Sequence, residues 1–195
     1  SQEPAKENAE KSAEELLETA KNLADSSLPQ ILPHAGLRMI YEGQQAVKMA
    51  DAFDAGTGTW KTGIVTGEGE EAAAASGDSF SYYAIEDAAD WEAFAASVNA
   101  GNTLAGKTVV LTQNVDLSSL ELQPVGLMNT KAGVMDYKFS GIFDGQGNTV
   151  TIAVNDSEKA YESHSVALFG CIENAVIKNL TVEGTMNITQ FAGAV

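Results

Sequence analysis

Four aspartates in the second half of the chain have a type and spacing that could do chemistry: Asp116, Asp136, Asp144 and Asp156. Two carboxyl groups held about 5 to 9 Å apart can cleave a glycosidic bond, one as an acid and the other as a base or nucleophile. Each of the four, however, occupies a position where a turn favours aspartate, whose carboxylate accepts hydrogen bonds from the nearby backbone. We therefore interpret all four as turn residues and predict no catalytic residues.

The other reactive side chains form no cluster in the sequence. Cys171 is the single cysteine, which excludes an intrachain disulfide and a Cys/His metal centre, and we expect it to be a small core residue. His34 and His164 lack any partner pattern and are interpreted as structural or solvated. Residues 56–62 are similar to a phosphate-binding loop, but Trp60 stands where that loop needs glycine for the backbone to approach phosphate. We predict no cofactor and no metal site.

Charge and hydropathy limit the partners of this chain. Its 195 residues include 27 acidic and 11 basic ones, and the formal net charge of -16 would repel nucleic acid and anionic membrane surfaces. No apolar run reaches the roughly 18 residues of a membrane span, so we predict no membrane insertion. The sequence opens at Ser1 without a charged and apolar leader, and we expect that a signal peptide has been removed. The many carboxylates leave a calcium-dependent fold open.

The elements that must position these residues change in type along the chain. From residue 4 to about residue 25, Ala and Leu recur at helical spacing, and a second amphipathic helix is predicted over about residues 37–53. A stretch rich in Gly, Ala and Glu follows and predicts a loop or linker. We therefore expect a helical region over residues 1–54, a linker over residues 55–80 and a further domain over residues 81–195.

This last domain is predicted to begin with a helix and to continue in strands. Acidic residues open the segment 86–101, its apolar residues share one face, and Gly101 is placed to end the helix in a left-handed conformation. Short β-rich runs separated by Gly, Asn and Asp then predict strands at residues 108–111, 138–143, 149–154, 165–169 and 176–182. Such strands form either an antiparallel sandwich or a solenoid whose coils bury their apolar faces against one another.

Eight short motifs favour the solenoid. In chain order they are Trp91-Glu92-Ala93-Phe94, Val98-Asn99-Ala100-Gly101, Gly106-Lys107-Thr108-Val109, Asp116-Leu117, Pro124-Val125-Gly126, Phe139-Ser140-Gly141-Ile142-Phe143-Asp144-Gly145-Gln146-Gly147, Leu168-Phe169-Gly170 and Ile177-Lys178-Asn179-Leu180-Thr181-Val182-Glu183-Gly184. This order resembles that of the pectate-lyase-like β-helix domains with GLUG-type repeats, which occur in bacterial cell-surface proteins. The resemblance covers about residues 83–195.

The resemblance implies a mainly β fold, a right-handed parallel β-helix of a few coils with an N-terminal capping helix. In such a fold the helix that carries Trp91 and Phe94 covers the first coil, and glycines after Asp144 allow a sharp corner. Asn179 is interpreted as a corner residue rather than as a glycosylation site. The sequence stops at Val195, which we expect to be mid-coil, so we expect either a longer protein or an end covered by another chain.

The resemblance also implies a location and a class of function. We expect a non-enzymatic module, secreted or at the cell surface, that displays or spaces a binding surface for a carbohydrate or host ligand; no residue identifies that ligand. One alternative is the N-terminal piece of a polysaccharide-lyase-like enzyme, although the β-helix segment has no arginine and the only one in the chain is Arg38. The other is a self-associating structural protein, a homo-oligomer joined through the open C-terminal coil or the N-terminal helices.

Overall fold

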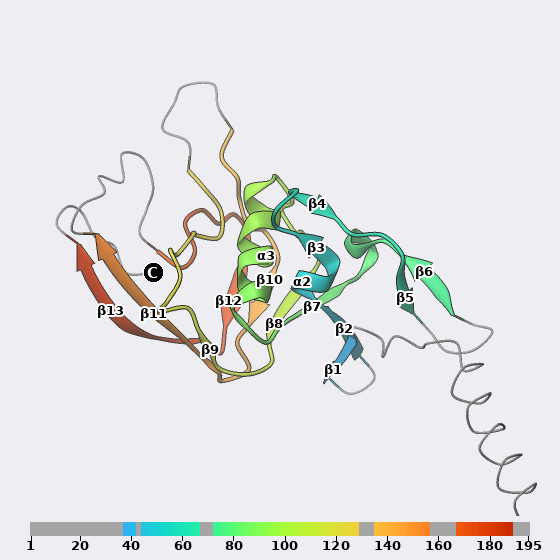
Figure 1. Ribbon diagram of the computed structural model, residues 1–195, viewed down its shortest axis with the longest axis horizontal. Coiled ribbons are helices and arrows are strands. Elements are labelled where there is room, and N and C mark those ends of the chain that lie inside the picture. Colours follow the sequence, from blue (N-terminus) through green and yellow to red (C-terminus); the bar gives the residue numbers. More distant parts are fainter. Residues whose placement is uncertain (1–36, 42–43, 67–71, 129–134, 157–166, 189–195) are drawn as a thin grey trace, which may run out of the picture. The chain divides into compact units, whose positions relative to one another are not determined.

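The computed structural model describes residues 37–41, 44–66, 72–128, 135–156 and 167–188 (Figure 1). The chain divides into two units, Ser1–His34 and Ala35–Val195, and every described residue belongs to the second unit. This unit is mainly β, as predicted, and its two largest sheets consist mostly of parallel strands. The helix predicted for residues 4–25 lies outside the described residues.

The main sheet has six strands in the order β1-β2-β7-β8-β10-β12. Their bounds are Leu37–Tyr41 for β1, Gln44–Lys48 for β2, Tyr82–Ile85 for β7, Thr108–Leu111 for β8, Ile142–Asp144 for β10 and Val176–Lys178 for β12. The pairs from β2 to β12 are parallel, and β1 runs antiparallel to β2. Thr108 pairs with Ile142, and Ile142 pairs with Val176. The number of residues between paired positions is therefore the same from β8 to β10 as from β10 to β12.

A second, three-stranded sheet has the order β13-β11-β9 and is parallel throughout. It comprises β9 at Val115–Asp116, β11 at Thr149–Asp156 and β13 at Thr181–Ile188. Val115 pairs with Val150 and Val150 with Val182, so the steps in this sheet are similar in length to those in the main sheet. Along the chain, β8, β10 and β12 are each followed by a strand of this sheet, so the chain passes alternately through the two sheets.

The helix predicted over residues 86–101 is confirmed as α3, Ala88–Asn99. The Asp87 carboxylate caps its N-terminus by accepting a hydrogen bond from the backbone N–H of Asp90 at 3.0 Å. Gly101 follows the helix with a φ of +99°, a conformation that a side chain would strain. The predicted apolar face is buried through Trp91 and Phe94, so local spacing and capping suffice to place this helix.

α3 lies in front of β10 of the main sheet in Figure 1, and aromatic side chains join the helix to the residues behind it. The Phe94 ring lies 5.3 Å from that of Phe139 and 5.8 Å from that of Phe143 in β10, and the Trp91 ring lies 6.0 Å from that of Phe169. Edge-to-face and offset contacts at these distances are the favourable arrangements for aromatic pairs. Val109 in β8 pairs with Phe143, and both are fully buried, so the core lies between α3 and the parallel sheets.

The helix predicted over residues 37–53 is wrong. Residues 37–48 form the strands β1 and β2, α2 spans only Met49–Ala52, and β3, Phe53–Asp54, follows it. The reason is tertiary: β2 adds to the edge of β7, which pairs Val47 with Tyr83 and buries both completely. A pairing partner so far along the chain leaves no mark on the local periodicity around Val47.

The predicted linker over residues 55–80 contains short strands in its described part. They are β4 at Thr59–Trp60, β5 at Ile64–Thr66 and β6 at Ala73–Ala75, followed by the single 3-10 turn η2 at Gly77–Ser79. This segment is tied to the main sheet, since the Tyr83 hydroxyl donates to the carbonyl of Gly77 at 2.8 Å. The pairing of β2 with β7 therefore crosses the boundary near residue 80 that the sequence predicts.

Among the predicted β strands, those at residues 108–111 and 149–154 are confirmed. The run 176–182 is divided into β12 and β13, and of the run 138–143 only residues 142–143 lie in β10. The strand predicted for residues 165–169 is wrong for its described part, where Phe169 makes a single parallel bridge with Val125. The bends on either side of Phe169 prevent this segment from pairing along a strand.

Candidate functional site

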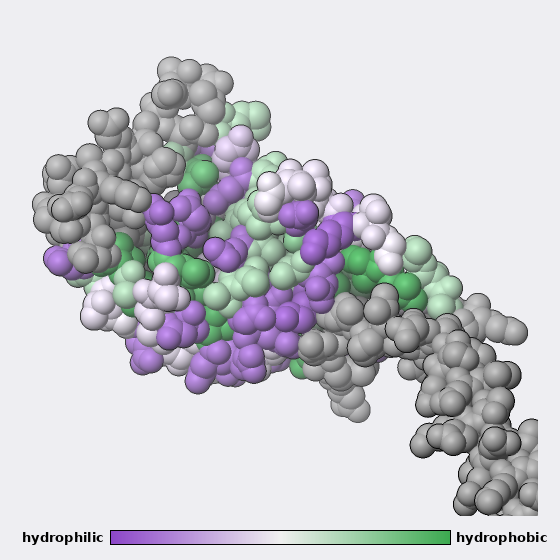
Figure 2. Space-filling view, viewed as in Figure 1, coloured by the Kyte–Doolittle hydropathy of each residue, from purple (hydrophilic) through white to green (hydrophobic). Residues whose placement is uncertain are grey.

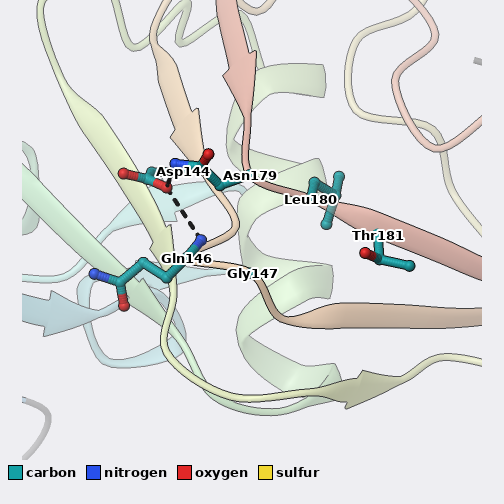
Figure 3. A pocket seen from close by; sticks show the side chains of 6 residues that line it. All are labelled: Asp144, Gln146, Gly147, Asn179, Leu180 and Thr181. Carbon is teal, nitrogen blue, oxygen red and sulfur yellow. Dashed lines mark hydrogen bonds between the residues drawn. The ribbon is translucent and has the colours of Figure 1, made fainter.

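The corner where β10 and β12 lead into the second sheet holds Asp144, one of the four aspartates singled out in the sequence (Figure 3). This side chain is buried, and its Oδ1 accepts hydrogen bonds from the Gln146 backbone N–H and from Asn179 Nδ2, both at 3.0 Å. Its Oδ2 lies 3.3 Å from Lys178 Nζ. The carboxylate is thus held by its own turn through Gln146 and by Lys178 and Asn179 at the end of β12.

The backbone of this corner explains its glycines and asparagine. Gln146, Gly147 and Asn179 have φ values of +50°, +80° and +54°, and the Gly147 N–H donates to the Asn179 carbonyl at 2.7 Å. A Cβ at Gly145 would stand 2.5 Å from that same carbonyl oxygen, so no side chain fits there. The predictions that Asp144 caps a sharp corner and that Asn179 is a corner residue are confirmed.

The other predicted carboxylates do not join Asp144. Asp116 ends β9 in the second sheet, where its Oδ1 accepts from the Ser118 backbone N–H at 2.8 Å. This hydrogen bonding to Ser118 lowers the pKa of Asp116 below its ordinary value, which favours the ionised turn residue that the sequence predicts. Asp136 is half-buried beside Lys138, and the side chain of Asp156 lies outside the described residues.

Cys171 is half-buried rather than part of the core, so the prediction of a core cysteine is wrong. It follows the Leu168-Phe169-Gly170 motif and lies beside the isolated bridge between Phe139 and Ile172, where its carbonyl accepts from the Phe139 N–H at 3.0 Å. Burial raises the pKa of its thiol, and the carboxylate of Asp136 adds to the effect. A raised thiol pKa disfavours the reactive thiolate.

His34 and His164 lie outside the described residues. In the loop that is similar to a phosphate-binding loop, Trp60 packs its ring 5.6 Å from that of Tyr83 and donates from Nε1 to Asn102 Oδ1 at 3.1 Å. Trp60 therefore has a packing role.

Among the described residues, no group of three or more His, Cys, Asp or Glu side chains is placed to hold a metal ion.

A buried charged cluster at the start of α3 was not predicted from the sequence. Asp90 has no exposed surface; its Oδ1 accepts from the Ala50 N–H at 3.0 Å and its Oδ2 from the Glu86 N–H at 2.9 Å. Lys48 Nζ lies 3.5 Å from Asp90 Oδ2 and 3.0 Å from Asp87 Oδ2. The cluster joins β2 and α2 to α3. The residues near Asp90 in the sequence do not indicate these partners, because Lys48 and Ala50 lie about 40 residues earlier in the chain.

The residues of this cluster shift one another's pKa values. Burial raises the pKa of Asp90 despite the hydrogen bonds from Ala50 and Glu86. Burial alone would lower the pKa of Lys48, but its hydrogen bond to Asp87 and the charge of Asp90 outweigh that effect and raise it. The cluster is therefore an ion-paired structural joint between two segments.

An apolar hollow of about 840 Å³ lies beside the last strands, β12 and β13. Its lining is Ile152, Ala167, Leu168, Phe169, Gly170, Ile172, Ile177, Lys178, Asn179, Leu180, Val182, Glu183, Gly184 and Met186. Figure 2, drawn in the same view as Figure 1, shows hydrophobic surface in the region of β11 and β13. We call this hollow the open face.

A smaller groove of about 360 Å³ runs between α3 and residues 117–127 and is lined mainly by Ala and Leu side chains. Trp91 contributes to its wall, and the Nε1 of Trp91 is buried without a hydrogen-bond partner. That atom is also inaccessible to solvent, so a molecule in the groove would not reach it. The open face is the larger of the two apolar surfaces.

None of the helices among the described residues combines the length and apolar character needed to cross a membrane. Comparison of the chain with family models, with curated proteins and with solved structures gives no match.

Proposed function

We propose that residues 81–195 form the first coils of a right-handed parallel β-helix and serve as a non-enzymatic display or spacing module, secreted or at the cell surface. The location and the class follow from the resemblance to β-helix domains with GLUG-type repeats. Its eight motifs run from Trp91 to Gly184 in the order of those domains.

One observation carries the fold of this proposal: the alternation of the chain between two parallel sheets with a nearly constant step. The step from Thr108 in β8 to Ile142 in β10 equals that from Ile142 to Val176 in β12, and the steps from β9 to β11 and from β11 to β13 are similar. A parallel neighbour requires a long return connection, and here that return passes through the other sheet each time. Repetition of such a step supports a solenoid of stacked coils.

The residues at the corners support a scaffold rather than a catalyst. The oxygens of Asp144 contact Gln146, Asn179 and Lys178, and Asp116 accepts from the backbone of Ser118. A general acid or base needs a carboxyl group that can reach a substrate proton. The two aspartates instead hold the geometry of the turns in which they lie.

The capping helix gives the module a closed first end. α3 packs its aromatic residues onto β10, and β2 adds to the edge of β7. A bare strand edge can pair with other chains, and β2 and β1 cover the edge of β7, the first strand of the proposed β-helix. The display surface would then lie on the outer faces of the coils.

The enzyme alternative is tested with the chain itself. The protein is incubated with a uronic-acid polysaccharide and calcium, and the unsaturated sugar that a lyase would release is followed by ultraviolet absorbance. We expect no release above that of heat-denatured protein. Release that disappears in Asp144→Asn would contradict the proposal and make the corner catalytic.

The display function is tested separately on a glycan array and on intact cells of the source organism. We expect labelling of unpermeabilised cells by antibodies against residues 81–195 and binding to a restricted set of glycans. Labelling that appears only after permeabilisation would rule out a surface location. The matched control is antibody against a cytoplasmic protein of the same cells.

A further inference from the structure

A polar hollow of about 670 Å³ lies at the corner that Asp144 holds (Figure 3). Its lining is Asp144, Gln146, Gly147, Asn179, Leu180 and Thr181, and we call it the corner hollow. Gln146 and Gly147 lie on the turn after β10, whereas residues 179–181 lead from β12 into β13. Two neighbouring turns of the chain therefore form one concave surface, with a volume typical of a small-molecule site.

Hydrogen bonds between the two turns hold the shape of the corner hollow. The buried Asp144 carboxylate accepts from the Gln146 N–H and from Asn179 Nδ2, and both donors belong to lining residues. The Gly147 N–H donates to the Asn179 carbonyl at 2.7 Å. Because these residues are already ordered, a molecule that binds here loses little of its binding free energy to the ordering of the protein.

The lining side chains keep hydrogen-bonding atoms that the protein does not use. Gln146, Asn179 and Thr181 are all exposed. Within the described part of the chain, no hydrogen bond uses the Thr181 hydroxyl, the Gln146 Oε1 or the Asn179 Oδ1. A Cβ added at Gly147 would meet no atom within 4 Å, so there is open space beside this glycine. These atoms are therefore accessible to a bound molecule.

The chemistry of the lining favours a neutral sugar. Amide and hydroxyl groups can donate and accept hydrogen bonds, as the hydroxyls of a sugar ring also do. Leu180 adds an apolar surface for the C–H groups of the ring. The net charge of -16 opposes an anionic ligand. The Asp144 carboxylate does not favour a free cation either, because it already contacts N–H donors and Lys178.

We infer that the corner hollow binds a neutral saccharide, whose hydroxyls form hydrogen bonds with Gln146, Asn179 and Thr181. Leu180 contacts the apolar side of the sugar ring. Asp144 is a positioning residue, since it holds the Gln146 backbone and the Asn179 amide and does not itself contact the sugar. The inference rests on the proposed display function and names the class of its ligand and the place where that ligand binds.

The test is an NMR titration of the whole isotope-labelled chain with neutral trisaccharides of glucose, of mannose and of N-acetylglucosamine. Trigalacturonate is the anionic comparison. We expect at least one neutral trisaccharide to bind and to shift the backbone amide signals of Gly147 and Thr181. We expect trigalacturonate to bind more weakly than that trisaccharide by about 10-fold or more, because of the net charge of the chain.

Two variants examine the lining directly. Thr181→Val removes the hydroxyl, and Gln146→Met removes the amide with little change in side-chain length. Each variant is expected to weaken the binding by about 5- to 10-fold, which corresponds to the loss of one hydrogen bond. Both side chains are exposed, so the variants should fold, which circular dichroism checks. The matched control is Thr185→Val, at an exposed threonine of β13 outside the corner hollow, which should leave the affinity unchanged.

Three results would overturn the inference. They are the absence of binding by all three neutral trisaccharides, binding of trigalacturonate as tight as that of the neutral ones, and an affinity that both variants leave unchanged. A trisaccharide that binds elsewhere on the chain removes the site but leaves the display function standing. Cell labelling that requires permeabilisation contradicts the surface location and does not alter the titration, so the two proposals fail separately.

Discussion

Asp144 and Asp90 are both buried aspartates, and they show what a sequence reveals at the scale of single residues. Asp144 accepts a hydrogen bond from the backbone N–H of Gln146, a local turn that the Asp-Gly-Gln-Gly sequence predicts. Asp90 accepts a hydrogen bond from the backbone N–H of Ala50, far earlier in the chain, and forms an ion pair with Lys48. The first role was predictable and the second was not, because its partners are set by tertiary packing.

Replacing Asp144 tests the corner. Asp144→Ala leaves the Gln146 N–H and the Asn179 amide without an acceptor, so we expect a loss of about 1 to 3 kcal/mol in the free energy of unfolding. Asp144→Asn keeps one acceptor oxygen and should lose less. Urea unfolding measures both, and Asp116→Ala, which removes an exposed turn aspartate, is the control with the smallest loss. Equal losses for the alanine and asparagine variants would contradict the assigned hydrogen bonds.

The charged cluster predicts a dependence of stability on pH. Burial raises the pKa of Asp90 above its ordinary 3.8, so the folded protein binds this proton more tightly than the unfolded chain. The contribution of Asp90 to the free energy of unfolding therefore falls as the pH rises from 3.8 through the raised pKa and is constant above it. Despite burial, the hydrogen bond from the Asp90 N–H and the contact with Lys48 lower the pKa of Asp87. The contribution of Asp87 to the free energy of unfolding is therefore lost as the pH falls below 3.8 toward the lowered pKa.

Asp90→Asn isolates this effect. Asparagine cannot accept from both the Ala50 and Glu86 N–H groups, so the variant should be less stable at every pH. Because it lacks the titration, its deficit relative to wild type should shrink as the pH rises above 3.8. Urea unfolding at several pH values from mildly acidic to neutral gives the two curves. A deficit that grows over this range would mean that Asp90 has a lowered pKa in the folded protein.

At the scale of elements, the predictions hold where the information is local. α3 carries its own cap and apolar face within residues 87–101, and the sequence places it correctly. The segment 37–53 has helical spacing but forms strands, because β2 gains a partner in β7. The difference lies in where the stabilising contacts come from, within the element or across the sheet.

Phe94→Ala tests whether α3 is the cap that holds these strands. The ring is fully buried and stacks on Phe143, so its removal is expected to cost about 3 to 5 kcal/mol. Glu92→Ala, on the exposed side of the same helix, should change stability little. Thermal unfolding of both variants gives the comparison. A Phe94→Ala protein as stable as wild type would exclude a capping role for α3.

At the scale of the molecule, the two largest sheets of the described residues end at β1 and β12 and at β9 and β13. β2 and α3 cover the first strand that the resemblance assigns to the β-helix, whereas β12 and β13 remain at the sheet edges. Sequence motifs predicted the corners and the strand repeats of this arrangement. They did not predict that residues 44–48 join the main sheet as β2, because that pairing involves residues outside the motifs.

The most direct test of the parallel stacking is a cysteine cross-link between β11 and β13. Thr151 and Glu183 pair in register, and the Thr151 hydroxyl lies 3.4 Å from a Glu183 carboxylate oxygen. In a Cys171→Ser background, cysteines at 151 and 183 should form a disulfide under mild oxidation, seen by mass spectrometry of the digested protein. Cysteines at 151 and 185, out of register, are the control. A bond in the control pair alone would contradict the parallel register and with it the proposed β-helix.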